Sequence, residues 1–130
     1  MLRDLNKTIL AITFALVAWC NGTNAQSITI SIPATEENWV VGNNYSCTYT
    51  YTGVSLIEVK IINSDANNAY VYFRDVKTDN GSPATRAIVV NKIDTLDSNA
   101  IRYCKLKVIG YNAMMQEVAS AIINVNLVNP

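Results

Sequence analysis

The stretch Tyr45-Ser46-Cys47-Thr48-Tyr49-Thr50-Tyr51 decides the fold class of this chain. Large side chains alternate in it with small hydroxyl residues, which is the period-2 pattern of a strand that buries one face. Cys47 lies on the face of the large residues. We therefore expect a strand with one side in a protein core.

A second cysteine, Cys104, lies in another alternating stretch at residues 101–108. Two cysteines on distant strands predict one disulfide, Cys47 to Cys104, that joins two sheets in an oxidising compartment. Such a bond would close a loop of about 57 residues and contribute about 4 kcal/mol in the chain-entropy account. The alternative is two free, buried thiols.

Most of the remaining sequence also has the pattern of short strands separated by turn residues. The predicted strands cover residues 28–32, 45–51, 56–62, 69–73, 84–90, 101–108 and 119–127. No amphipathic helix is predicted after residue 25. Seven antiparallel strands, with cysteines on the second and the sixth, predict an all-β, immunoglobulin-like sandwich with one inter-sheet disulfide.

Three local patterns refine this prediction. Pro33 ends the first strand and favours an edge position, because proline cannot donate to a sheet ladder. In the third strand, Glu58 and Lys60 alternate with apolar residues, which predicts one buried face and one wet face. Gly42 belongs to a predicted turn at 39–44, where glycine tolerates positive φ.

Residues 1–25 have the features of a secretory signal. Arg3 and Lys7 give a positive start, an apolar run follows, and the small residue Ala25 suits signal peptidase. The apolar run is shorter than the about 20 residues that a membrane-spanning helix needs. We therefore expect a signal peptide at 1–25, one sandwich domain at 26–130, and no stable membrane insertion after cleavage. A retained anchor and a lipoprotein signal ending at Cys20 are the alternatives.

The whole chain has ten basic and ten acidic residues. The segment 1–25 holds Arg3, Lys7 and Asp4, which leaves eight basic and nine acidic residues in the remainder. A net charge near −1, with the basic residues scattered along the sequence, gives no electrostatic reason to expect nucleic acid or an anionic membrane as partner.

The chain contains no histidine, which removes the usual general base and the commonest zinc ligand. A glycosidase would need only two carboxyls at a set separation, but no spacing here selects a pair. A faint calcium-loop pattern at 63–67 lacks the glycine and the distal glutamate of such loops. We expect no enzyme, no catalytic residue, no cofactor and no metal. The carboxylates considered are Glu36, Glu37, Asp75, Asp79, Asp94 and Asp97.

Tyr70 and Tyr72 are the candidate ligand-binding residues, because they share one face of a predicted strand and sugar rings stack on exposed aromatic faces. The plain alternative is that both are packing residues whose hydroxyls reach the surface. Trp39 is expected to cover the disulfide as part of the core. Asn44 and Asn80 each begin an Asn-x-Ser acceptor sequence for N-glycosylation in a predicted turn.

Two resemblances support an extracellular sandwich. The run from Asp97 to Cys104 is similar to the run that precedes the second cysteine of immunoglobulin domains, although Arg102 stands at the corner-tyrosine position. Three motifs, Ile28-x-Ile-x-Ile-Pro33, Asn38-Trp39-Val40-Val41-Gly42 and Tyr45-x-Cys-x-Tyr-x-Tyr51, resemble the amino-terminal Ig-like module of fungal Ser/Thr-rich, GPI-anchored surface proteins and of related cell-wall glucan-assembly proteins. This resemblance is clearest over residues 28–62, and it implies a secreted or wall-associated glycoprotein module without a catalytic residue.

We therefore expect a secreted or cell-surface, non-catalytic binding module. Its partner would be a cell-wall glycan or a surface protein. The alternative is a self-associating structural or effector-like secreted protein, a homo-oligomer that pairs through an exposed edge strand. A carboxylate-based glycan hydrolase is a third hypothesis.

Overall fold

The computed structural model describes residues 25–64, 70–93 and 95–130. This part of the chain forms nine strands and no helix. The strands are β1 (Ser27–Ile32), β2 (Glu37–Val40), β3 (Tyr45–Thr52), β4 (Leu56–Asn63), β5 (Val71–Lys77), β6 (Ala84–Ile88), β7 (Ile101–Arg102), β8 (Cys104–Tyr111) and β9 (Glu117–Val128). Residues 1–24 of the predicted signal, and most of the predicted turn that follows β4, lie outside the described residues.

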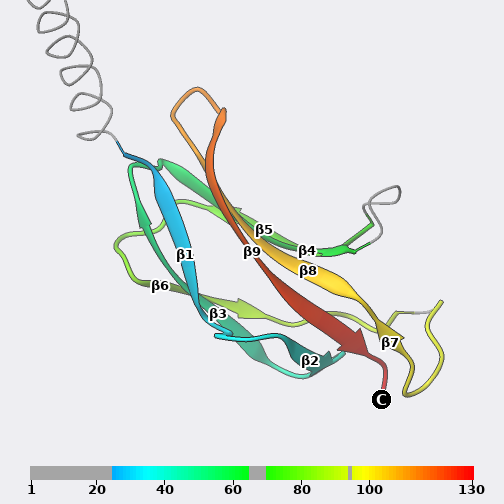
Figure 1. Cartoon of the computed structure of the whole chain (residues 1–130). Coiled ribbons are helices and arrows are strands. Elements are labelled where there is room, and N and C mark those ends of the chain that lie inside the picture. Colours follow the sequence, from blue (N-terminus) through cyan, green and yellow to red (C-terminus); the bar gives the residue numbers. More distant parts are fainter. Residues whose placement is uncertain (1–24, 65–69, 94) are drawn as a thin grey trace, which may run out of the picture.

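The strands form two layers (Figure 1). One sheet has the order β1-β3-β6, and the other has the order β2-β9-β8-β4-β5, with β7 beside β9. The two cysteine-bearing strands, β3 and β8, therefore lie in different sheets, and each has a strand on both sides. The predicted all-β fold with two sheets is confirmed, and this strand order is that of an immunoglobulin-like sandwich.

The predicted number of seven strands is wrong, for two reasons. Residues 37–40 were expected to be a loop and a turn, but they form β2, which pairs in parallel with the end of β9. The predicted sixth strand is interrupted at Tyr103, so that β7 pairs only with β9 whereas β8 pairs with both β4 and β9. Neither pairing has a signature in the local sequence.

The alternating patterns place the core where the sequence predicts it. Cys47 and Tyr49 of β3 are fully buried, and Tyr45 and Tyr51 pack against the same cluster. Strand β1 is at the edge of its sheet, as Pro33 predicts. The core cluster draws on both sheets, so the large faces of the strands meet in the interior of the sandwich.

The outer face of β4 was expected to be exposed to solvent, but at Glu58 it is not. Its side chain points away from the core cluster, yet it is only 3% exposed. Arg74 and the hydroxyl of Tyr111 donate hydrogen bonds to its carboxylate, and the ammonium of Lys60 lies 3.7 Å from it. Long neighbouring side chains therefore cover this carboxylate, which local alternation cannot reveal.

The predicted Cys47–Cys104 disulfide is not formed. Both cysteines are free, and both are fully buried in the core cluster. Burial raises the pKa of the Cys47 thiol to about 12 and that of Cys104 to about 11. Because the thiolate is the form that reacts, these thiols are unreactive at neutral pH. No disulfide joins Cys47 of one sheet to Cys104 of the other.

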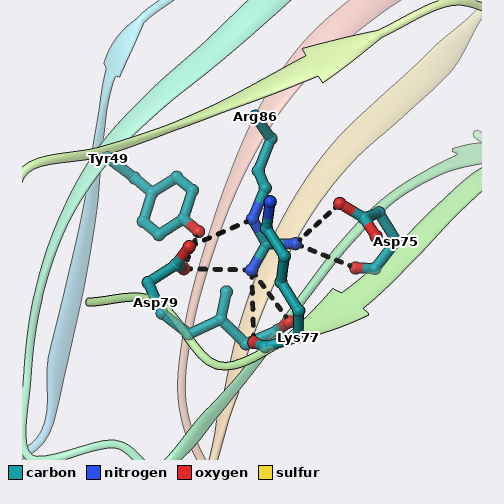
Figure 2. Close-up of polar contacts among 6 residues, drawn as sticks. Tyr49, Asp75, Lys77, Asp79 and Arg86 are labelled. Carbon is teal, nitrogen blue, oxygen red and sulfur yellow. Dashed lines mark hydrogen bonds and ion pairs between the residues drawn. The ribbon is translucent and has the colours of Figure 1, made fainter. Parts of the chain in front are cut away.

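A buried arginine joins the two sheets instead (Figure 2). Arg86 extends from β6, and its side chain has no exposed area. Its guanidinium donates to the carboxylates of Asp79 and Asp75, and to the backbone carbonyls of Ile57 and Lys77. Ion pairs and carbonyl acceptors thus satisfy a charge that would be costly if it were buried alone.

Trp39 and Gly42 lie near the start of β3. Trp39 is 2% exposed and stacks on Tyr45, with ring centroids 4.6 Å apart and planes 2° apart. Its predicted burial is confirmed, but no disulfide lies beneath it. Gly42 has a φ of 92°, as the predicted turn requires, and its amide donates to the carbonyl of Val90.

Candidate functional site

A pocket of about 510 Å³ lies where β4 ends, β5 begins and the connection from β6 to β7 passes. Its lining combines two aromatic residues with amide, hydroxyl, cationic and aliphatic side chains. The lining residues are Asn63, Tyr70, Val71, Tyr72, Asn91, Lys92, Ile93, Thr95 and Arg102. The volume falls in the range of small-molecule sites, and the mixture of groups suits a ligand with both apolar and hydrogen-bonding surfaces.

The tyrosine pair forms the aromatic part of the lining. The ring centroids of Tyr70 and Tyr72 lie 4.9 Å apart with an angle of 51° between their planes. Tyr70 is 61% exposed, whereas Tyr72 is partly buried against the core cluster. The inner ring is therefore fixed by packing, and the outer ring is free to meet a ligand.

A bulge in the β4–β5 pairing places these rings. Ile61 pairs with Phe73, but Ile62 pairs with Val71, so Tyr72 is the extra residue. An extra residue re-aims the side chains beside it. As a result, Tyr72 and Phe73, although adjacent in sequence, both pack against the core cluster. The backbone of Tyr70 is held as well, because its carbonyl accepts from the amide of Asn63 at 3.0 Å.

Lys92 and Arg102 give the pocket a cationic lining. Burial raises the pKa of the Tyr72 hydroxyl, and the positive charge of Arg102 acts in the opposite direction. The hydroxyl of Tyr72 therefore stays protonated at neutral pH and is available as a donor or an acceptor. The pocket as a whole favours electron-rich oxygen groups on its ligand.

Asn129 anchors the connection between β6 and β7. This connection supplies four of the lining residues, Asn91, Lys92, Ile93 and Thr95. Its side chain is buried, and its amide nitrogen donates to the carbonyls of Ile93 at 2.8 Å and Leu96 at 2.7 Å. The amide of Ile93 donates to the Asn129 side-chain oxygen at 3.4 Å. This residue follows β9 and positions a pocket wall without touching the ligand space.

The structure places both Tyr70 and Tyr72 at the pocket, but not on one face of a regular strand, because Tyr70 precedes β5 and Tyr72 is the extra residue of the bulge. The amide, hydroxyl and cationic members of the lining were not among the predicted site residues. They come from segments far apart in the sequence, and no local motif marks them. The same holds for Asn129, because a buried asparagine and an exposed one look alike in a sequence.

The other predicted site residues do not line this pocket. Asn44 is exposed just before β3, and Asn80 is exposed in the loop after β5, so both glycosylation acceptors are accessible. Trp39 and Gly42 lie around the start of β3, and neither Cys47 nor Cys104 is among the lining residues.

Two of the candidate carboxylates are already paired with a cation. Asp75 and Asp79 are both bound by Arg86, and Asp79 also accepts a hydrogen bond from the Tyr49 hydroxyl. Asp94, a further candidate, lies outside the described residues. Within residues 25–64, 70–93 and 95–130, no group of three or more potential ligands is arranged to hold a metal ion.

The described part of the chain contains no helix that is long and apolar enough to cross a bilayer.

Comparisons with known proteins give a weak structural likeness. No family model matches the chain, and no curated protein matches it. Among solved structures, the chain is similar to one described as "Structures of Clostridium thermocellum CbhA fibronectin(III)-like modules", with a TM-score of 0.49 and 10% identity. The match covers 78% of this chain and 96% of that one. A likeness at this level assigns no function to the protein.

Proposed function

We propose that the protein is a secreted, non-catalytic module that binds a saccharide in the pocket beside Tyr70 and Tyr72. The observation that carries this proposal is the exposed ring of Tyr70 at the edge of a polar pocket. Its centroid lies 4.9 Å from the centroid of the Tyr72 ring, which packs against the core. Aromatic faces pack against the C–H faces of sugar rings, and Tyr combines such a face with a hydroxyl.

The polar lining supports a saccharide over a purely apolar ligand. The amide side chain of Asn91, the hydroxyl of Thr95 and the cationic groups of Lys92 and Arg102 surround the rings. Sugar hydroxyls both donate and accept hydrogen bonds, and each of these groups can serve one of them. An apolar ligand would bury such groups without partners, which is costly.

The sequence supports an extracellular localisation. Residues 1–25 have the pattern of a secretory signal, and the two Asn-x-Ser acceptors lie on exposed positions. A wall-associated role would follow if the saccharide is part of a cell wall. Asp75 and Asp79 are both paired with Arg86, and the proposal includes no catalytic step.

The alternative, self-association through an edge strand, has weaker support. Strand β5 is at the edge of its sheet and exposes Val71 and Val76. However, Arg74 and Lys77 lie on the same strand, and charged side chains on an edge oppose pairing with a second copy. A dimer whose amount rises with protein concentration in size-exclusion chromatography would favour this alternative.

A glycan array followed by isothermal titration with the best oligosaccharide tests the proposed function. Tyr70→Ala should weaken binding about tenfold or more, because a lost stacking contact of about 1.4 kcal/mol gives that factor. Tyr103→Ala is the matched control, since Tyr103 is 63% exposed but does not line the pocket. Equal binding by the wild type and Tyr70→Ala, or no binding to any glycan, would refute the proposal.

A further inference from the structure

Three cations lie side by side on the outer face of the larger sheet. Lys60 of β4 pairs in register with Arg74 of β5 on one side and with Lys107 of β8 on the other. The neighbours of Lys60 in β4, Val59 and Ile61, are both in the core cluster, so Lys60 and its two partners face away from the core. We call Arg74, Lys60 and Lys107 the cationic row.

The cationic row is only partly neutralised by its surroundings. Like charges directly opposite each other on adjacent strands destabilise a sheet. Glu58 is the acid that binds the row: Arg74 donates to it, and the ammonium of Lys60 lies 3.7 Å away. Lys107 makes no ion pair with any residue that the structure describes, and neither does Lys105, which lies two register pairs away on β8 and points to the same face.

Negative charge is scarce on this face. The carboxylate of Glu58 is 3% exposed and lies under its partners, whereas the Arg74 side chain is 64% exposed. Glu117 pairs with Tyr111 toward one end of the sheet, and Glu36 accepts a hydrogen bond from Asn126 beside β2, so neither acid is a register partner of the row. An approaching molecule therefore meets Arg74, Lys60, Lys105 and Lys107 before it meets a carboxylate. Basic residues that are scattered in the sequence are gathered on one face by strand register.

The shape of the face favours an extended, repeating anion. Neighbouring strands are about 4.8 Å apart, so the row offers its cations at short, regular intervals across a sheet. None of these residues lines the pocket beside Tyr70 and Tyr72. A polymer with an acidic group on successive units could contact several cations at once.

Two other partners fit the face less well. Protein interfaces are depleted in lysine and enriched in aromatic residues at their centres, whereas two of the three residues in the row are lysines. Nucleic-acid surfaces add exposed aromatic rings on which bases stack. Of the aromatic residues near the row, Tyr111 is partly buried and donates its hydroxyl hydrogen bond to Glu58, and Tyr72 packs against the core cluster.

We propose that the cationic row binds an acidic polysaccharide, a chain that bears carboxylate or sulfate groups. This inference rests on residues other than those of the tyrosine pocket, and so it stands or falls separately from the proposed function. The two surfaces share β5, since Arg74 follows Tyr72 by two positions. A saccharide chain could therefore reach both.

Lys107 gives the cleanest test, because its removal breaks no ion pair. Binding of the purified protein to polygalacturonate and heparin should weaken about fivefold in Lys107→Gln and further in the Lys105→Gln/Lys107→Gln variant. Lys77→Gln is the matched control, because it removes an equal charge from an exposed position on β5 outside the row. Binding should also fall as salt rises, and neutral dextran should not bind.

Two outcomes of this binding experiment would contradict the proposal. Equal binding by the wild type and the Lys105→Gln/Lys107→Gln variant, with unchanged circular dichroism, would overturn the proposal. Tighter binding to polyglutamate or to anionic vesicles than to polygalacturonate would overturn the choice of a polysaccharide. If Tyr70→Ala abolishes binding to a neutral glycan but not to polygalacturonate, both surfaces function. Loss of polygalacturonate binding in Lys105→Gln/Lys107→Gln alone supports the row and leaves the pocket to its own test.

Discussion

Arg86 and Asp79 form a two-point ion pair in the interior. Nε of Arg86 lies 3.3 Å from Oδ1 of Asp79, and Nη2 lies 3.0 Å from Oδ2 (Figure 2). The Arg86 side chain has no exposed area, and that of Asp79 is 8% exposed. The same guanidinium donates to the carbonyl of Ile57 in the opposite sheet at 3.3 Å. A charged residue thus joins two layers that a disulfide was expected to join.

Replacing this arginine should destabilise the fold strongly. Arg86→Met removes the cationic partner of two carboxylates and leaves both without a compensating positive charge. Breaking a buried ion pair in this way costs about 3–5 kcal/mol. Urea unfolding followed by circular dichroism measures the loss. Lys92→Met is the control, because Lys92 is exposed and should change the free energy of unfolding by less than about 0.5 kcal/mol. Similar values for the two variants would contradict the role given to Arg86.

Acid should weaken the fold through Asp79. Burial alone would raise the pKa of this carboxyl, but hydrogen bonds from Arg86 and Tyr49, and the charges of Arg86 and Lys77, outweigh burial and lower the pKa. The ionised form is therefore favoured in the folded state. Its stabilisation is present above about pH 4, near the pKa of an unfolded aspartate, and is lost as the pH falls through the lower folded pKa.

Urea midpoints measured between about pH 7 and pH 2 test this pH dependence. The wild type should lose stability on the acid side. Asp79→Asn should be less stable at pH 7 and should lose less between pH 5 and pH 2, because one of the linked protons is gone. Glu58→Gln should behave in the same direction, since the pKa of Glu58 is also lowered, with burial opposing hydrogen bonds from Arg74 and Tyr111. Parallel profiles for wild type and Asp79→Asn would exclude the effect.

Two thiols should titrate only after unfolding. Cys47 and Cys104 are fully buried and free, with pKa values raised to about 12 and about 11. In a Cys20→Ser background, a thiol reagent without reductant should count no cysteine in the native protein and two in guanidinium chloride. The count of zero in both conditions would mean that the two sulfurs are bonded.

Asn129 should be required to hold the pocket wall. Asn129→Ala deletes the donors to the carbonyls of Ile93 and Leu96, and a lost buried hydrogen-bond partner costs about 1–3 kcal/mol. Asn124→Ala, which replaces an exposed asparagine on β9, is the control. Hydrogen exchange at the Ile93 amide should speed up in Asn129→Ala and stay unchanged in Asn124→Ala. Equal exchange in both variants would count against a positioning role.

The face of each strand was predictable because alternation is a local property. The inward positions of β3 follow from large residues at every second place, and the same reasoning places Val59 of β4 and Leu127 of β9 in the core. Strand β2 was missed because four residues that pair in parallel with a distant strand carry no pattern of their own. The proximity of Tyr70 and Tyr72 was predictable, but the bulge and the pocket beside them were not.

The sequence by itself determined the fold class, the inward faces of β3, β4 and β9, and the turn at Gly42, because each depends on residues a few positions apart. The tertiary structure alone decided that Arg86 is buried, that the two cysteines stay free, and that Lys60 lies between Arg74 and Lys107. Those features depend on the register between strands that are distant in the chain. Register follows from the packing of the whole core, and no single stretch of sequence encodes it.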